Sequence, residues 1–435
     1  LYVPESWPSL SNNDFRGLRG LDYAETAFRV TRPFIGNSIS DDDYRQIINE
    51  SYASFNHSAV TPLVQLGPDF WSLELFHGPT LAFKDVALQL LGHLFEHVLA
   101  RRGERIAIVG ATSGDTGSAA IEACRDRNNI AICILHPKGR TSEAQRRQMT
   151  TVDAANVRNI AIEGDFDSCQ DIVKELFADK AFRDSVNLSA VNSINWARVM
   201  AQIVYYVYAA VRLGAPDREV AFAIPTGNFG NVFAGYVAMQ MGLPVERLIV
   251  ASNRNDILTR FFDRGRMQRE AVVPSLSPSM DIQVSSNFER LLFELLGRDG
   301  AKTTAIMDQF SSTGQFNVDD DVMARATALF SAYRLDDEGT IAEIAATAQQ
   351  TGMVIDPHSA VGLSAARRAH ADGMVPADVP IISLACAHPA KFDQAVKTAT
   401  GVTPALPPHM ADLMSRRERQ QHVAANADAV KDLIL

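Results

Sequence analysis

The chain has 435 residues, of which 46% are hydrophobic and 21% are charged, a composition typical of a globular protein with a large buried core. Its 41 basic and 51 acidic residues give a formal net charge of −10, which argues against nucleic acid or an anionic membrane as the main partner. The four cysteines form no Cys-x-x-Cys pair, so we expect neither a zinc ribbon nor any other metal site, and a reducing compartment suits them.

No segment of the sequence predicts a membrane span. The longest apolar run, about residues 199–211, contains Gln202 and is too short to cross a bilayer. The N-terminus lacks the basic region and apolar core of a signal peptide, so we expect a cytoplasmic protein. Because the chain begins at Leu1 rather than Met, we expect residues 1–75 to be part of a longer N-terminal region.

The elements expected along the chain alternate between helix and strand from about residue 85. Residues 1–75 look irregular, with a helical pattern near residues 41–55, and residues 264–286 are expected to form a loop. Helices are expected at about 86–99, 118–127, 142–152, 166–179, 195–213, 231–241, 287–296, 321–333, 341–350, 360–371 and from 391. Strands are expected at 106–109, 130–135, 157–162, 220–224, 248–251 and 381–385.

Continuously apolar strands between helices predict parallel sheets covered on both faces. Two such blocks indicate two doubly wound α/β lobes with a cleft between them. We expect an N-terminal region at 1–75, a first lobe at 76–215, a second lobe at 216–400 and a tail at 401–435.

The most informative stretch is His77–Asp85, with the sequence His-Gly-Pro-Thr-Leu-Ala-Phe-Lys-Asp. It places Lys84 after a Gly-Pro loop and directly before a helix with an apolar face. A lysine in this position could form a Schiff base with pyridoxal phosphate (PLP). Most lysines are solvated surface charges, so the stretch gains its meaning from two glycine-rich turns elsewhere.

The first of these turns, Gly110–Gly117, follows a predicted strand and opens a predicted helix. Its glycines permit a tight turn, and free N–H groups at a helix start bind anions. A carboxylate or phosphate cradle, a dinucleotide-binding turn and a plain turn all fit. The Gly-x-Gly-x-x-Gly spacing is absent, and the motif alone leaves these possibilities open.

The second turn, Pro225–Asn231, also joins a predicted strand to a predicted helix. Its backbone N–H donors could surround one phosphate at a helix N-terminus. The alternative is a structural turn, because asparagine-rich turns are common. If this turn faces Lys84 across the cleft, the two lobes together form a single cofactor site.

The stretch Asn192–Arg198 offers amides, a hydroxyl and a guanidinium just before a Met- and aromatic-rich segment that we expect to be a core helix. Such a set can bind a phosphate. A helix N-cap at Ser193 or Asn195 followed by a surface arginine is the alternative, and the residues alone favour it.

One rival pattern is His93-Leu-Phe-Glu-His97, which matches the inverted zinc-protease signature His-x-x-Glu-His. The two histidines share a helix face, on the polar side of the apolar stripe. The sequence provides neither an evident third ligand nor a cleft over this helix. We therefore expect no zinc chemistry.

Taken together, several blocks resemble threonine synthase, in the longer class of that family found in bacteria and fungi. The resemblance extends from Leu1 to about Phe392. The lysine block and the Ala-His-Pro-Ala-Lys-Phe block are specific to the family, whereas the glycine turns are not. The blocks are His77–Asp85, Ala111–Gly117, Thr226–Asn231, Asp356–Ala360 and Ala387–Phe392.

The resemblance implies a fold-type-II PLP enzyme, similar to the tryptophan synthase β subunit. It implies a lyase that converts O-phospho-L-homoserine and water to L-threonine and phosphate by γ-elimination and β-addition, the last step of threonine biosynthesis. It also implies a monomer or weak dimer. By analogy Lys84 holds PLP covalently, and the cofactor phosphate binds to Gly227, Asn228, Phe229, Gly230 and Asn231. The substrate is assigned to Ser113, Gly114, Asp115 and Thr116, and its phosphate to Asn192, Ser193 and Arg198.

The sequence departs from the family pattern at Cys386, where threonine is usual near the pyridine nitrogen of PLP. A thiol is a weak hydrogen-bond donor, so we expect a poorer bond but an unprotonated nitrogen, as with a hydroxyl. The alternative is a small buried strand residue. The expected chemistry requires Lys84 as a neutral base, so its pKa must be depressed by burial or a nearby cation.

Three other functions compete with this interpretation. Another fold-type-II enzyme, such as threonine dehydratase or cysteine synthase, is disfavoured by the N-terminal region and the Ala-His-Pro-Ala-Lys-Phe block. A non-catalytic homologue is disfavoured by the intact Lys84 and glycine turns. A Rossmann dehydrogenase is disfavoured because the two turns fall in different lobes.

Overall fold

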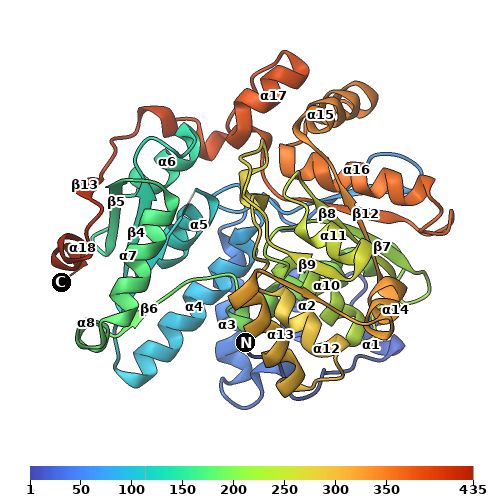
Figure 1. Cartoon of the computed structure of the whole chain (residues 1–435), viewed down its shortest axis with the longest axis horizontal. Coiled ribbons are helices and arrows are strands. Elements are labelled where there is room, and N and C mark those ends of the chain that lie inside the picture. Colours follow the sequence, from blue (N-terminus) through green and yellow to red (C-terminus); the bar gives the residue numbers. More distant parts are fainter. Residues whose placement is uncertain (113, 435) are drawn as a thin grey trace.

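The computed structural model describes residues 1–112 and 114–434, which form two α/β lobes built on two main sheets. In Figure 1 the smaller sheet lies at the left and the larger one at the right. Helix α4 (Lys84–Arg102) begins at Lys84 and runs between the lobes, packing against helices of both. Its first residue is therefore held at the junction of the lobes.

The large sheet has the strand order β1-β2-β12-β7-β8-β11, parallel except for the antiparallel pair of β1 and β2. Its central strand β7 is buried at every position, as expected for a sheet covered on both faces. The strands are β1 (Leu63–Gln65), β2 (Phe70–Glu74), β7 (Val220–Pro225), β8 (Val245–Ser252), β11 (Phe330–Arg334) and β12 (Ile381–Ala385).

Alternation along β7 decides which helices cover each face of this sheet. Phe222 and Ile224 belong to the main core with α9 (Trp196–Arg212) and α10 (Gly230–Gln240). The alternating Ala221 and Ala223 pack against α16 (Pro357–Ala371) on the other face. A Cβ atom on Gly362 of α16 would lie 2.8 Å from Pro225 Cγ, closer than packed carbons approach. The small residues on this face therefore permit the close approach of α16 to the sheet.

The small sheet has the strand order β13-β5-β4-β3-β6, and all its strands are parallel. One face packs on α4 and α5 (Asp115–Cys124), and the other on α7 (Phe166–Ala178) and α18 (Ala427–Ile434). The strands are β3 (Ile106–Ala111), β4 (Ile130–Pro137), β5 (Val157–Glu163), β6 (Leu188–Ser189) and β13 (Gln421–Ala424).

All six expected strands are present, but the structure corrects the sequence analysis in three places. The helix expected at 321–333 ends at Leu329, and β11 follows it directly. The region 1–75 is largely regular, with α1 (Asn12–Arg16), α2 (Tyr23–Ile35) and α3 (Asp41–Ala53), each capped by a Ser or Asp side chain. The loop expected at 264–286 contains β9 (Arg266–Gln268), which pairs with β10 (Gln315–Asn317), and a short 3₁₀ helix, η1 (Pro278–Met280).

The expected division of the chain at residues 75, 215 and 400 stays a prediction. The sheets cross these boundaries, since β1 and β2 join the large sheet and β13 joins the small one. In the part of the chain that the structure describes, no helix combines the length and apolar character needed to cross a bilayer. The remaining helices are α6 (Glu143–Thr150), α8 (Lys180–Ser185), α11 (Ile257–Arg264), α12 (Phe288–Leu295), α13 (Gly300–Thr313), α14 (Asp320–Leu329), α15 (Asp337–Thr351), η2 (Pro389–Phe392), α17 (Asp393–Thr400), η3 (Pro408–Met410) and η4 (Leu413–Ser415).

Candidate active site

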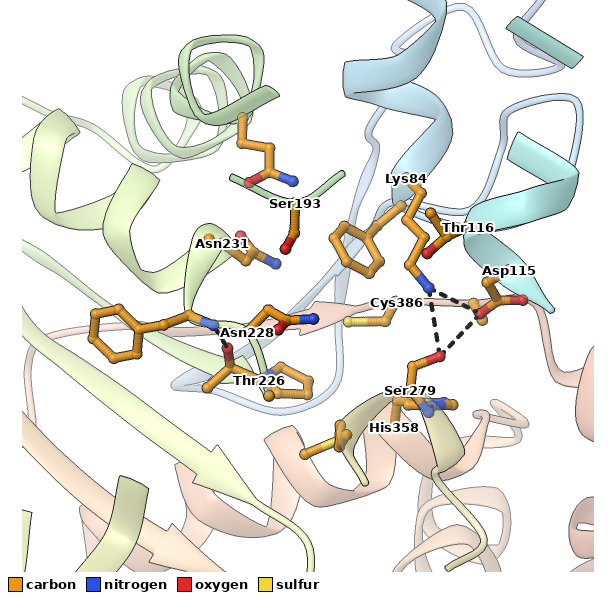
Figure 2. Close-up of a pocket in the computed structure, with 18 of the residues that line it drawn as sticks. Lys84, Asp115, Thr116, Ser193, Thr226, Asn228, Asn231, Ser279, His358 and Cys386 are labelled. Atoms are coloured by element: carbon orange, nitrogen blue, oxygen red, sulfur yellow. Dashed lines mark hydrogen bonds and ion pairs between the residues drawn. The ribbon is translucent and has the colours of Figure 1, made fainter. Parts of the chain in front are cut away.

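A pocket lies where the first residues of α4, α5 and α10 and the end of β12 face one another (Figure 2). It encloses about 740 Å³ of empty space, a volume that includes its open mouth. Helix starts dominate its wall, so backbone N–H groups and positive helix ends point toward it. The predicted residues that line it are Lys84, Asp115, Thr116, Ser193, Arg198, Gly227, Asn228, Phe229, Gly230, Asn231 and Cys386.

Lys84 points into this pocket and is 8% exposed. Its amine donates a hydrogen bond to Ser279 Oγ at 3.4 Å and lies 3.6 Å from Asp115 Oδ2. Burial lowers the pKa of Lys84 below its usual value; Asp115 opposes this shift, while the cations Lys391 and Arg198 add to it. A lysine that acts as a neutral base needs a depressed pKa, and the pocket provides the burial and the nearby cations that lower it.

Asp115 is held on both of its carboxylate oxygens. Oδ1 accepts a hydrogen bond from Gln145 Nε2 at 2.8 Å and pairs with Lys391 Nζ at 2.7 Å. Ser279 Oγ lies 3.4 Å from Oδ2. Burial alone would raise the pKa of Asp115, but the ammonium groups of Lys391 and Lys84 hold it well below its usual value. The carboxylate therefore stays ionised beside the reactive amine.

The turn before α10 has an unusual backbone conformation next to its hydrogen-bond donors. Phe229 adopts a left-handed backbone conformation with φ of 63°, which is rare outside glycine, and its N–H donates to Thr226 Oγ1 at 3.2 Å. The strained residue ends the turn and starts the helix at Gly230. Strain of this kind occurs where the surrounding structure enforces a functional geometry.

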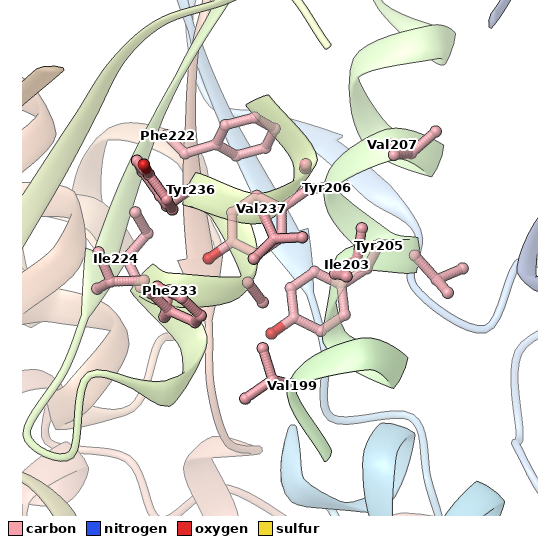
Figure 3. Packing of buried hydrophobic residues seen from close by; sticks show 14 of the residues in the cluster. Val199, Ile203, Tyr205, Tyr206, Val207, Phe222, Ile224, Phe233, Tyr236 and Val237 are labelled. Atoms are coloured by element: carbon pink, nitrogen blue, oxygen red, sulfur yellow. The ribbon is translucent and has the colours of Figure 1, made fainter. Parts of the chain in front are cut away.

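Asn231 is oriented by two tyrosines of the core helix α9. The hydroxyls of Tyr205 and Tyr206 both donate to Asn231 Oδ1, and Tyr206 also donates to its carbonyl at 2.8 Å. Figure 3 shows both rings within the apolar core of α9, α10 and β7. With its oxygen occupied, the amide must direct Nδ2 elsewhere, and this buried donor has no partner among the described residues. Asn231 Nδ2 can therefore donate a hydrogen bond to an acceptor bound in the pocket.

Arg198 is the second unsatisfied donor of the pocket. It is 5% exposed, and neither Nε nor Nη1 has a hydrogen-bond partner within the described chain. Burial lowers the pKa of Arg198 to about 10, so it remains a cation at neutral pH. The surface arginine that the residues alone favoured is therefore wrong, and the buried guanidinium is suited to a bound anion.

A short segment joins the two donor sets and was not identified from the sequence. Asn287 is fully buried, and its Nδ2 donates to the carbonyls of Asn228 at 3.0 Å and Ser193 at 3.1 Å. Ser286 Oγ lies within hydrogen-bond distance of Asn228 Oδ1 and Ser193 Oγ, at 3.1 and 3.2 Å. Arg290 donates to Asn287 Oδ1 and to the carbonyl of Ile194. The turn before α10 and the stretch before α9 are thus fixed to one another.

Of the other predicted substrate residues, some line the pocket and some do not. Thr116 lines the pocket, whereas Gly114 is buried behind it, where a Cβ atom would lie 2.5 Å from Gln145 Cδ. Asn192 is exposed and is not part of the pocket wall. Ser113 lies outside the residues that the structure describes.

Cys386 follows β12, and its side chain enters the pocket. Its thiol makes only a weak contact, 3.8 Å from the carbonyl of Leu384. Burial, reinforced by the negative charge of Asp356, raises the pKa of Cys386 well above its usual value, so the group is a neutral thiol. It is placed as a neutral partner for whatever occupies the pocket centre.

His358 and Ser279 also line the pocket, and the sequence analysis gave neither a role. His358 Nδ1 lies 2.7 Å from Asp356 Oδ2, and Nε2 accepts the N–H of Ser279 at 3.3 Å. An accepting Nε2 requires the proton on Nδ1, where Asp356 binds it. This pair positions η1 beneath Lys84 (Figure 2). The block Asp356–Ala360 was noted in the sequence, but Ser279 falls in a segment without periodicity.

The rival histidine pattern has an ordinary structural role. His93 Nδ1 lies 3.4 Å from both Glu50 Oε2 and Arg127 Nη1, and Glu96 accepts from Asn129. Among the described residues, no cluster of His, Cys, Asp or Glu side chains could hold a metal ion.

Comparisons with known proteins agree with this geometry. Residues 55–387 match the model of the pyridoxal-phosphate dependent enzyme family, which defines the class of the chain as PLP-dependent enzymes. Residues 1–52 and 359–434 match the threonine synthase N-terminal and C-terminal models. The chain belongs to the threonine synthase family, as the following relatives also show.

The chain is 56% identical to the threonine synthase of Pseudomonas aeruginosa, over 96% of this chain and 89% of that protein. The crystal structure of PLP-bound threonine synthase from Brucella melitensis superposes with a TM-score of 0.97 at 49% identity, covering 100% of this chain and 92% of the other. The yeast threonine synthase structure superposes with a TM-score of 0.94 at 39% identity, with the same coverage. The fold-type-II prediction is confirmed.

The residues of the pocket fit PLP. Lys84 supplies the amine that the PLP aldehyde requires. The start of α10 suits the PLP phosphate, together with Asn231 Nδ2, which has no partner in the part of the chain that the structure describes. The neutral thiol of Cys386 would suit a pyridine nitrogen. No buried carboxylate that lines the pocket other than Asp115 competes for these donors, within the described chain.

Proposed function

We propose that the chain converts O-phospho-L-homoserine and water to L-threonine and phosphate, with PLP held by Lys84 and by the turn Gly227–Asn231. Membership of the threonine synthase family supports the threonine-forming reaction. The identity of the substrate is the further step, and Arg198 supports it.

The observation that supports a phosphorylated substrate is a second anion site in one pocket. PLP brings one phosphate, for which the α10 start and Asn231 provide donors. Arg198 is an additional buried cation that lines the same pocket as Ser193, and its Nε and Nη1 atoms have no hydrogen-bond partner among the described residues. A substrate of threonine dehydratase carries only the carboxylate common to all amino acids. A second phosphate accounts better for this guanidinium.

When bound, PLP supplies the electron sink that stabilises negative charge next to the substrate amine. The chain's own residues then position the substrate and move protons. Lys84 Nζ, with its depressed pKa, is the base for the substrate Cα proton, and Ser279 Oγ holds that amine by a hydrogen bond. Arg198 and Ser193 bind the phosphate that leaves, and Thr116 orients the carboxylate end. In this proposal Ser113 also belongs to the substrate site, Gly114 supports that site from behind the pocket wall, and the exposed Asn192 lies outside it.

The proposal also covers the cellular location, the oligomeric state and the division of the chain into lobes. The buried thiols of all four cysteines support a reducing, cytoplasmic location. We propose a monomer or weak dimer, as the family resemblance implies. We propose residues 76–215 and 216–400 as the cores of the two lobes, with 1–75 and 401–435 adding strands to them.

The test is a product assay on the purified chain with PLP and O-phospho-L-homoserine. We expect threonine and inorganic phosphate in equal amounts, and neither with Lys84→Ala. Formation of 2-oxobutanoate and ammonia from threonine, without phosphate release from phosphohomoserine, would instead indicate a dehydratase.

A further inference from the structure

Lys391, in the Ala-His-Pro-Ala-Lys-Phe block, is a buried cation to which the mechanism above gives no role. It is 1% exposed, and its ammonium group binds Asp115 Oδ1 at 2.7 Å and the carbonyl of Thr80 at 2.8 Å. Lysine is almost never fully buried unless it is paired, and burying an ion pair costs free energy, so we ask what this pair contributes. Its partner is the carboxylate that also faces Lys84.

Asp115 thus lies between two lysines at unequal distances. Lys391 Nζ is 2.7 Å from Oδ1, a hydrogen-bonded ion pair, whereas Lys84 Nζ is 3.6 Å from Oδ2, beyond hydrogen-bond length. Gln145 Nε2 also donates to Oδ1 at 2.8 Å and fixes the carboxylate in this orientation. The stronger interaction of Asp115 is therefore with Lys391.

Without Lys391, the nearest cation to Asp115 would be Lys84. A carboxylate in a buried site stabilises the charged form of a neighbouring lysine. An ammonium group has no lone pair and neither attacks an aldehyde nor accepts a proton. A single carboxylate beside the reactive amine would thus hold it in the inactive form.

We propose that Lys391 is a positioning residue for the reaction: it engages Asp115 in place of Lys84, so that Lys84 remains available as a neutral amine. This inference rests on the proposed function, in which Lys84 is the PLP lysine. It assigns a role to a lysine that does not itself line the pocket, in a block whose first residue, Ala387, does.

The other charged and titratable groups around Lys84 come from every element packed against it. They are Asp115 on α5, Lys391 on η2, Arg198 on α9, Cys386 after β12 and His358 on α16. Lys391 and Arg198 are basic side chains, and Asp115 is an acidic one. The proposal therefore predicts opposite effects when Lys391 and Asp115 are neutralised separately.

The experiment measures how fast the full chain, freed of cofactor, takes up PLP between pH 6 and pH 10, followed by visible absorption. Only the neutral amine attacks the aldehyde, so the midpoint of the profile reports the ionisation of Lys84. We expect Lys391→Met to move the midpoint to higher pH by about one to three units, the usual effect of an adjacent opposite charge. Asp115→Asn should move it to lower pH. Lys397→Met, an exposed lysine on α17, is the matched control and should leave the midpoint in place.

If Lys391→Met does not fold, Lys391→Gln takes its place, and its midpoint should also move to higher pH. Unchanged midpoints, or shifts in the same direction for both variants, would overturn it and leave Lys391 a structural ion-pair partner. Failure of the underlying function is separate, because in that case the unmodified chain would form no covalent adduct at Lys84 with PLP.

Discussion

Replacing Arg198 with methionine should make the ligand-free protein more stable and its substrate binding weaker. Burial lowers the pKa of this guanidinium from 12.5 to about 10. At about 1.36 kcal/mol per unit, the charged group costs the ligand-free folded state roughly 3 kcal/mol. Because the folded pKa is depressed, this cost is complete below about pH 10 and is relieved only as the pH rises toward 12.5.

Methionine fills a volume similar to that of arginine but carries no charge. Replacing buried ionic groups with apolar side chains often stabilises the folded protein by about 1–4 kcal/mol. We therefore expect a gain in the free energy of unfolding of up to about 3 kcal/mol at pH 7.5 in phosphate-free buffer. A lost charge-assisted hydrogen bond is worth about 1.5–3 kcal/mol, so the KM for O-phospho-L-homoserine should rise about ten- to a hundredfold. PLP affinity should stay near that of the unmodified chain.

The assay is urea unfolding of the ligand-free protein, followed by unfolding of the PLP-saturated protein at increasing inorganic phosphate. The unmodified chain should gain stability with phosphate, since ligands that bind only the folded state stabilise it, and Arg198→Met should gain much less. Arg212→Met, at the exposed end of the same helix, should respond as the unmodified chain does. A ligand-free Arg198→Met protein that is less stable and still responds fully to phosphate would refute the reasoning.

Three further predictions concern the pocket and its surroundings. Lys84→Ala removes the amine that faces the pocket centre, so borohydride reduction should leave no covalent PLP; a reducible adduct elsewhere, found by peptide mass spectrometry, would contradict the assignment. Cys386→Thr should retain activity, whereas Cys386→Asp should alter the visible spectrum and the product ratio; unchanged values for the Asp variant would count against its placement near the pyridine nitrogen. Burial lowers the pKa of His388 to about 4, so stability should fall as the pH drops from 6.5 toward 4, when only the unfolded chain takes up the proton. In His388→Asn this acid-induced loss, measured by urea unfolding at both pH values, should be smaller; an equal loss would place the effect on other groups.

The sequence predicted the elements whose patterns are local. Apolar runs such as Val220–Ile224 and the glycine turns after them fix strands and helix starts over a few residues, and the structure has them there. Arg198 was harder, because its side chain lies on a helix that is buried nearly all round. Position on that helix does not reveal whether a guanidinium faces solvent or a pocket.

Other features depend on contacts between distant segments. The strand β11 continues directly from α14, so the apolar pattern shows no break at Phe330, and only pairing with β8 makes it a strand. Ser279 lies in an aperiodic segment, and its contact with Lys84 joins residues 195 positions apart. The Lys391–Asp115 pair was equally hidden, because a lysine in a sequence reads as a surface charge until its burial is known.

The central claim is that water adds to the carbon skeleton after phosphate has left, and an isotope experiment tests it most directly. The purified chain, loaded with PLP, is supplied with O-phospho-L-homoserine in water labelled with oxygen-18, and both products are analysed by mass spectrometry. We expect the label in the hydroxyl of threonine and none in the released phosphate. Labelled phosphate together with unlabelled homoserine would mean simple hydrolysis of the phosphate ester, and would contradict the assignment of Lys84 and Arg198 to a lyase reaction.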